Sequence, residues 1–187
     1  MILGGVYIAC EYSIIAHSDG DIISHSVCDA LLGAASLGDI GKFFPNTDEF
    51  KNISGAEMIK IVLNELKSKN YEIINIDITY IGEIPKIEKH RSEILQNLAN
   101  MLKIDSEKIS CKATTTDKMG FIGKKEGISC LTNVFNRKTC KMNILLTNDD
   151  GIDHPGLQTL LLTLSKKHNV FTMAPDRNRS GFGSAVT

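Results

Sequence analysis

The chain has 187 residues, of which 42% are hydrophobic and 23% are charged, and its formal net charge is −1. This composition is typical of a folded globular protein. It argues against a disordered chain and against a general nucleic-acid binder, whose phosphate contacts need a surplus of basic residues. No apolar run is long enough to cross a bilayer, and five cysteines without a CxxC motif favour reduced thiols. We therefore expect a cytoplasmic protein without nucleic-acid or membrane partners.

Strands and helices alternate along the first 135 residues or so. Apolar residues at three- and four-residue spacing predict helices, and strict alternation predicts half-buried strands. Ser54, followed by Glu57 three residues later, is a capping-box pattern at the start of a helix. We expect strands at residues 3–8, 71–81, 109–115 and 127–135, helices at 22–37, 54–69 and 88–102, and a loop at 38–48.

A short basic connector at residues 136–141 separates this part from a fresh pattern. A strand at 142–147, a helix at 154–168 and a strand at 170–174 read as one βαβ unit, followed by a polar loop. We predict an α/β (α+β) fold: a mixed sheet packed against helices, plus a partial Rossmann-like βαβ unit. The predicted domains are residues 1–137 and 142–187, joined by a linker at 138–141.

The segment HSDGD at residues 17–21 is the first candidate for chemistry. Asp21 and Ser24 can cap the helix that follows, and His25, one turn into it, could bind a metal near the positive helix end. The spacing alone favours simple capping by the acids, because one histidine with scattered carboxylates does not make a zinc site.

Two loops are further candidates. Asp39, Asn46 and Asp48 lie in the loop at 38–48, where such residues usually form turns. The segment KATTTDKMGFIGKKEG at 112–127 combines hydroxyls, Asp117, glycines and lysines, which suits a loop that binds phosphate and a divalent ion. A solvated hairpin end is the alternative reading.

Taken together, six collinear segments resemble one enzyme family, the 2-C-methyl-D-erythritol 2,4-cyclodiphosphate synthases. They are LGGV (3–6), HSDGD (17–21), DALLGAASLGDIG (29–41), FPNTD (44–48), IPK (84–86) and KATTTDKMGFIGKKEGI (112–128). The resemblance implies a homotrimer with active sites between neighbouring subunits. It implies a phosphorus–oxygen lyase of the non-mevalonate isoprenoid pathway, which converts 4-diphosphocytidyl-2-C-methyl-D-erythritol 2-phosphate to the cyclic diphosphate and releases CMP.

The resemblance also implies roles for individual residues. His25 would be a zinc ligand, and Asp117, in place of the family's glutamate, would hold Mg²⁺ or Mn²⁺. His17 and Thr115 would stabilise the transition state. The substrate would be bound by Ser18, Asp39, Ile40, Gly41, Phe44, Pro45, Asn46, Thr47, Asp48, Gly82, Pro85, Lys86, Thr114, Thr116, Phe121 and Lys124, the last in place of an arginine.

In the family, an Asp-x-His pair upstream of the LGGV strand completes the zinc site, and Met1 falls in the region that follows this pair. We therefore expect the first domain to lack its first strand and to bind zinc weakly, since each ligand supplies much of the affinity. Two other functions remain open: a non-catalytic trimer that binds cytidine phosphates, and a metal-dependent 5′-nucleotidase residing in the tail.

The tail resembles a second family. MNILLTNDDGIDHPG (142–156) and APDRNRSG (174–181) are similar to the N-terminus of SurE-type nucleotidases, which hydrolyse nucleoside monophosphates with a divalent metal. The resemblance implies that Asp149, Asp150 and Ser180 are metal ligands. Because that family's domain is much longer, we expect no activity from the tail alone.

Overall fold

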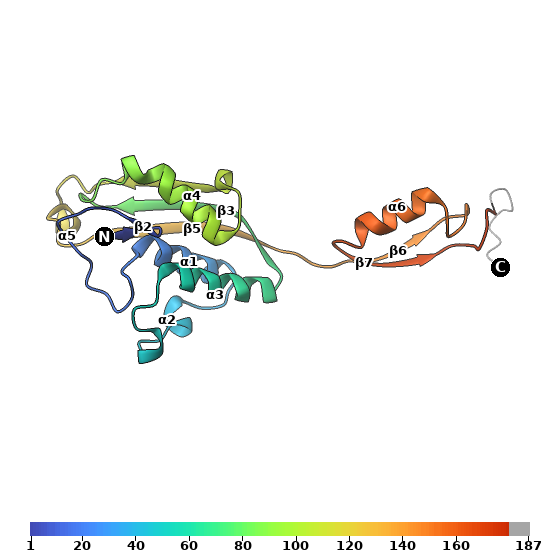
Figure 1. Ribbon diagram of the computed structural model, residues 1–187, viewed down its shortest axis with the longest axis horizontal. Coiled ribbons are helices and arrows are strands. Elements are labelled where there is room, and N and C mark those ends of the chain that lie inside the picture. Colours follow the sequence, from blue (N-terminus) through green and yellow to red (C-terminus); the bar gives the residue numbers. More distant parts are fainter. Residues whose placement is uncertain (180–187) are drawn as a thin grey trace. The chain divides into compact units, whose positions relative to one another are not determined.

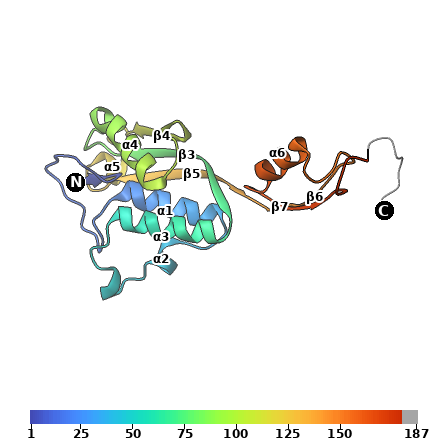
Figure 2. The same ribbon diagram turned by 45° about the vertical axis from the view of Figure 1, so that its right-hand side comes forward.

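The computed structural model describes residues 1–179, and the chain divides into two compact units, residues 1–138 and residues 139 onward. The first unit contains a mixed sheet of β3 (Tyr71–Ile81), β4 (Ile109–Thr114) and β5 (Ser129–Lys138). The central strand β3 pairs in parallel with β4 and antiparallel with β5. Helices α1 (Ile22–Ala34), α3 (Gly55–Ser68) and α4 (Arg91–Leu102) pack along this sheet (Figures 1 and 2). The predicted mixed sheet packed against helices is confirmed.

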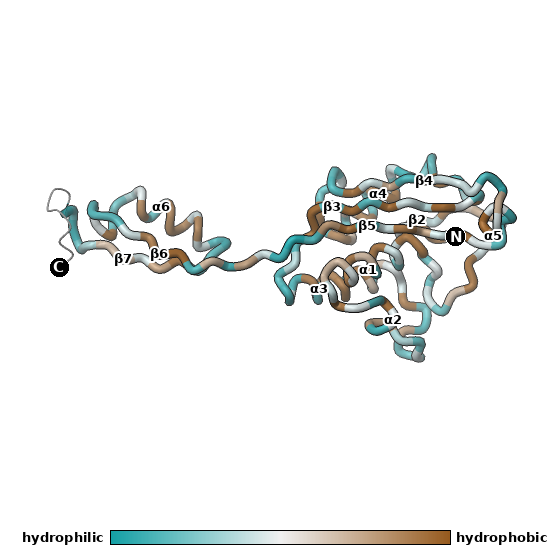
Figure 3. Tube along the Cα trace, turned by 180° about the vertical axis from the view of Figure 1, so that it is seen from behind, coloured by the Kyte–Doolittle hydropathy of each residue, from teal (hydrophilic) through white to brown (hydrophobic). Residues whose placement is uncertain are grey.

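The hydrophobic core of the first unit lies between the helices and one face of the sheet. On β3, Ile76, Ile78 and Tyr80 alternate with less buried neighbours and are almost fully enclosed. The hydrophobic segments of the strands and helices are brown in Figure 3. Side chains on the second face of the sheet remain accessible: Leu131 and Phe135 of β5 are 59% and 65% exposed. No helix in residues 1–179 is long and apolar enough to cross a membrane.

Several elements match the sequence prediction closely. Strand β3 has the predicted bounds, and helix α3 begins after Ser54 with the predicted capping box, in which Glu57 reciprocates. In the second unit, β6 (Asn143–Thr147), α6 (Pro155–Leu164) and β7 (Asn169–Met173) form the predicted parallel βαβ unit.

The predicted strand at residues 3–8 is instead a hairpin of β1 (Ile2–Leu3) and β2 (Val6–Tyr7). The reason is the Gly4–Gly5 pair, whose positive φ angles of 59° and 74° suit a tight turn. The predicted connector is also partly wrong, because residues 136–138 belong to β5 and pair with the start of β3.

Helix ends differ from the prediction elsewhere. Helix α1 ends at Ala34 because Ser36 adopts a left-handed conformation, with a φ of 57°. The loop at 38–48 contains a short helix α2 (Ile40–Phe43) capped by Asp39. A 3₁₀ turn at Glu88–His90 precedes α4, the short helix α5 (Gly120–Gly123) lies between β4 and β5, and α6 ends before residue 168. Further 3₁₀ turns span Asp48–Phe50 and Ser106–Lys108.

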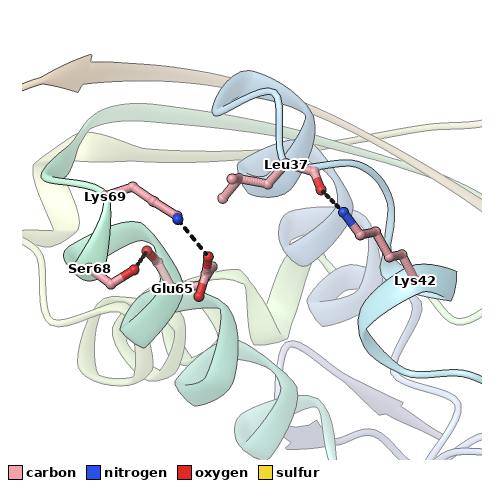
Figure 4. A network of polar contacts seen from close by, with 5 residues as sticks. All are labelled: Leu37, Lys42, Glu65, Ser68 and Lys69. Carbon is pink, nitrogen blue, oxygen red and sulfur yellow. Dashed lines mark hydrogen bonds and ion pairs between the residues drawn. The ribbon is translucent and has the colours of Figure 1, made fainter.

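Figure 4 shows how polar contacts finish α3 and brace the loop after α1. The Ser68 hydroxyl donates to the Glu65 carbonyl at 2.8 Å, and Lys69 lies 4.0 Å from the Glu65 carboxylate. The Lys42 ammonium donates to the Leu37 carbonyl at 3.4 Å. Such exposed contacts stabilise a fold only slightly. We therefore interpret them as contacts that end the helices and not as part of a binding site.

Candidate active site

Eleven of the twenty predicted site residues of the first unit line one of two pockets. The first, which we call the histidine pocket, has a volume of about 210 Å³ and lies between the start of α1 and the loop around α2. Its lining includes six predicted residues: His17, Ser18, His25, Ile40, Phe44 and Asn46.

The two histidines of this pocket differ in setting. His25, half-buried on α1, has its Nε2 atom 3.1 Å from the Ser18 hydroxyl oxygen. His17 is exposed, and its backbone carbonyl accepts a hydrogen bond from Asn52 at 2.9 Å. The Phe44 ring packs edge-on against Phe50, with ring centroids 5.6 Å apart, and forms an apolar wall. The pocket therefore offers imidazole and hydroxyl groups beside a rigid apolar surface.

The acids of the HSDGD segment build the scaffold of this pocket. Asp21 is fully buried and accepts four hydrogen bonds. The donors are the Gly4 and Gly5 amides at 2.8 and 2.7 Å, and the Ser24 amide and hydroxyl at 3.1 and 2.7 Å. Asp19 accepts from the Gly55 amide at 2.8 Å and so joins the segment to α3. The capping interpretation of these two acids is the one that the structure supports.

The second pocket, which we call the lysine pocket, has a volume of about 330 Å³ and lies where β3 and β4 end. It is lined by five predicted residues, Gly82, Pro85, Lys86, Thr114 and Thr115. The Gly82 amide donates to the Thr114 carbonyl at 3.0 Å, which extends the pairing of the two strands.

Tyr80 supports the loop that carries Lys86. Its hydroxyl donates to the Ile84 carbonyl at 2.9 Å, ahead of the cis Ile84–Pro85 bond. Burial raises the pKa of Tyr80, so this hydroxyl stays a donor. A Cβ atom at Gly82 would lie 2.6 Å from the same hydroxyl oxygen, so a larger residue there would have to displace the Tyr80 side chain.

The threonine loop after β4 is held by its own polar groups. The Thr115 hydroxyl lies 3.4 Å from an Asp117 carboxylate oxygen, and the Thr116 hydroxyl donates to the Met119 carbonyl at 2.7 Å. Asp117 itself has a positive φ of 51° and an exposed side chain. The Asp117 carboxylate is therefore presented to solvent, where it can meet a ligand.

The two pockets do not merge within one chain. His17 lines the histidine pocket and Thr115 lines the lysine pocket, so the two predicted catalytic residues belong to different pockets. The remaining predicted residues line neither pocket: Asp39, Gly41, Pro45, Thr47, Asp48, Thr116, Asp117, Phe121 and Lys124. The range 82–88, expected to hold the cytidine diphosphate, includes Glu88, which lines the lysine pocket, whereas sequence reasoning missed Tyr80 and Arg91. Their nearness to the IPK segment was the only available signal.

The described residues do not by themselves complete a metal site. No group of three or more His, Cys, Asp or Glu side chains among residues 1–179 is arranged to hold an ion. His25 and Asp117 remain single candidate ligands.

The two tail motifs meet at the carboxyl ends of β6 and β7. The Arg179 amide donates to the Asp149 carbonyl at 2.7 Å, and the Ile152 amide donates to the Pro175 carbonyl at 2.8 Å. The Asp149 side chain is exposed and Asp150 is half-buried. Ser180, the third predicted ligand, lies outside the described residues.

Comparison with known proteins assigns these features to two families. Residues 1–136 match the YgbB family, and residues 144–187 match Survival protein SurE. A 2-C-methyl-D-erythritol 2,4-cyclodiphosphate synthase of Saccharophagus degradans is 45% identical over 135 residues, which are 72% of this chain and 87% of that protein. Its namesake from Haemophilus ducreyi is 49% identical over 131 residues, 70% of this chain and 82% of that protein.

Solved structures agree with this assignment. The bifunctional IspDF of Campylobacter jejuni has a TM-score of 0.69 and 44% identity, covering 73% of this chain and 37% of that chain. A CDP complex of IspF from Plasmodium falciparum has a TM-score of 0.66 and 38% identity, covering 74% of this chain and 83% of that chain. The chain therefore belongs to the YgbB family, and it continues into a segment that matches Survival protein SurE.

Proposed function

We propose that this chain is a 2-C-methyl-D-erythritol 2,4-cyclodiphosphate synthase. It would convert 4-diphosphocytidyl-2-C-methyl-D-erythritol 2-phosphate to the cyclic diphosphate and release CMP. The observation that carries the proposal is the lysine pocket, which combines Lys86 with the hydroxyls of Thr114 and Thr115 in a chain 45% identical to a synthase over most of its length. The CDP complex of the Plasmodium falciparum relative supports a cytidine-linked substrate.

The main task of the protein in this reaction is to position the phosphate groups of the substrate. The nucleophile is the substrate's own anionic 2-phosphate, which attacks the β-phosphorus of the diphosphate while the bond to CMP breaks. Two anionic groups must be brought together and aligned, and their repulsion must be offset. We assign Lys86 to charge compensation at the diphosphate and Thr115 and His17 to hydrogen bonding at the transition state. Ser18 and the 39–48 loop, with Phe44 as its apolar wall, would hold the methylerythritol phosphate.

We also propose that the active site is completed between subunits of a homotrimer. The separation of His17 and Thr115 into two pockets supports this, because the reaction needs both groups at one substrate. The accessible second face of the sheet, with Leu131 and Phe135 exposed on β5, supports burial against other subunits. Phe135→Lys should then give monomers in light scattering, whereas Ile61→Lys, at an exposed apolar position on α3, should leave the assembly intact. Trimers in both variants would contradict an interface through this face.

Divalent metals are the cofactors of this family, and we propose Zn²⁺ at His25 and Mg²⁺ or Mn²⁺ at Asp117. When bound, such ions neutralise phosphate charge and fix the geometry of attack. Further ligands would have to come from outside the described residues or from the substrate. His25→Ala should lower the zinc content of the purified protein, and an unchanged content would refute the assignment of this ligand.

For the domains, we propose a synthase domain that ends with β5 at Lys138, one residue beyond the expected boundary, then a linker at 139–141 and an incomplete SurE-like domain at 142–187. The paired acids Asp149 and Asp150 at the end of β6 support a metal-binding ancestry for the tail. The five free cysteines support a reducing compartment, and we propose the cytoplasm.

Phosphorus NMR of the reaction mixture tests the proposed function. The assay uses the chain as printed and the same chain extended at its N-terminus with an Asp-x-His strand of the family, each with Zn²⁺ and Mg²⁺. We expect one CMP and one cyclic diphosphate per substrate consumed, and no phosphate release from AMP. If neither protein consumes the substrate, the proposed synthase activity is refuted. Phosphate release from AMP would favour the nucleotidase.

A further inference from the structure

One cation of the lysine pocket, Arg91, has no role in the resemblance, and one of its side-chain nitrogens has no hydrogen-bond partner among residues 1–179. Arg91 is the first residue of α4, and its side chain lines the pocket together with Lys86 and Glu88. Its Nε atom is buried and makes no hydrogen bond within the described residues. Glu88 makes no ion pair with it there.

An unpaired buried donor on a cation is costly. Leaving a guanidinium N–H desolvated without an acceptor opposes folding, so such groups are rare unless a ligand supplies the acceptor. Two other arginines illustrate the usual outcome: Arg137 pairs with Glu72 at 2.8 Å, and Arg179 lies 3.8 Å from Asp176. Arg91 therefore points to an acceptor that comes from a bound molecule.

The surroundings of Arg91 indicate the kind of acceptor. Lys86 and Arg91 place two positive charges in a pocket of about 330 Å³, and Glu88 contributes one negative charge. The hydroxyls of Thr114 and Thr115 line the same pocket and add neutral donors. A planar guanidinium beside an ammonium and hydroxyls matches a phosphate group better than a neutral carbonyl.

We propose that Arg91 is a substrate-binding residue that donates hydrogen bonds to a phosphate oxygen of the cytidine diphosphate moiety. This inference rests on the proposed function and adds to it a residue that the family resemblance does not assign. It makes the first turn of α4 part of the nucleotide site. Lys86 and Arg91 then share the charge of the diphosphate from neighbouring positions in the same pocket.

Calorimetric titration with CDP tests the proposal on the full-length chain. Arg91→Gln should weaken CDP binding by about 10- to 100-fold, the usual range for losing a hydrogen bond to a charged group. Arg91→Lys should fall in between, because it keeps the charge and loses the planar fork. Lys89→Gln is the matched control, since it removes one positive charge at an exposed position outside the pocket.

A second ligand separates phosphate binding from base binding and from misfolding. Cytidine binding, followed by saturation-transfer NMR, should be equal in the wild type and in Arg91→Gln. If Arg91→Gln weakens cytidine and CDP alike, or leaves CDP binding at the level of Lys89→Gln, the phosphate assignment is wrong. If the wild-type chain binds no CDP, the proposed function fails and this inference fails with it.

Discussion

The buried carboxylate of Asp21 offers the sharpest test of how this fold builds its histidine pocket. It joins the Gly4–Gly5 turn of the N-terminal hairpin to the first turn of α1 through four hydrogen bonds of 2.7–3.1 Å. Asp21→Asn keeps one acceptor oxygen and turns an amide N–H₂ toward two of the four donors. Those donors are the Gly5 amide and the Ser24 hydroxyl, if the retained oxygen takes the place of Oδ1.

The magnitude follows from the bonds that are lost. A hydrogen bond to a charged group contributes about 1.5–3 kcal/mol, and the Ser24 hydroxyl can rotate to accept from the new amide. One lost charge-assisted bond, together with the weakening of the others, gives a destabilisation of about 2–4 kcal/mol. Asp21→Ala should cost more, because it leaves every donor unpaired and creates a cavity.

Tyrosine fluorescence during urea unfolding measures this effect in the first unit alone. The chain has no tryptophan, and its four tyrosines are Tyr7, Tyr12, Tyr71 and Tyr80, all within residues 1–138. Asp48→Asn is the control, because it removes an exposed carboxylate whose loss should change stability by less than about 0.5 kcal/mol. If Asp21→Asn and Asp48→Asn unfold at the same urea concentration and with the same slope of unfolding free energy against urea, the structural role of Asp21 is refuted.

Two further predictions concern the lysine pocket and the thiols. Gly82→Ala should displace the Tyr80 hydroxyl and weaken CDP binding at least tenfold (about 1.4 kcal/mol), as titration would show, and unchanged affinity would mean that the clash is relieved elsewhere. At about pH 8 the exposed Cys140 should react first with a thiol reagent. Burial raises the pKa of Cys28 to about 12 and that of Cys111 to about 11, so both stay protonated and should react only on unfolding. Labelling of Cys28 in the folded protein, detected by peptide mass spectrometry, would contradict this burial.

The periodicity of the hydrophobic residues and the capping residues predicted most helices and strands correctly. Residues 74–79 of β3 alternate between apolar and polar, and Ser54 with Glu57 marks a helix start through local hydrogen bonds, so both are visible in the sequence. The hairpin at Gly4–Gly5 was missed because its strands are too short to show a period. Residues 136–138 look like a linker since they are polar, yet pairing with β3 makes them a strand. For residues 136–138, pairing with a strand distant in the sequence outweighs the local preference of polar residues for a loop.

The candidate site was only partly accessible to sequence reasoning. Motif resemblance named His17 and Lys86, but no spacing rule shows that their loops form separate pockets in one chain. Asp21 looked like a plain cap, whereas its bonds to Gly4 and Gly5 depend on the fold. Arg91 carries no motif at all, and only its unpaired buried Nε atom identifies it.

The central claim is that the histidine pocket of one subunit and the lysine pocket of its neighbour form one active site. Subunit complementation tests it most directly. The experiment uses the printed chain or the N-terminally extended chain, whichever converts the substrate. His17→Ala and Lys86→Ala each damage one pocket, and each should abolish most CMP release alone. When equal amounts of the two variants assemble at random, three quarters of the trimers contain both variants. Each mixed trimer has one site of three in which both pockets are intact, so about a quarter of all sites are intact. Recovery of about a quarter of wild-type CMP release is the predicted result. No recovery in mixed trimers would contradict a site shared between subunits.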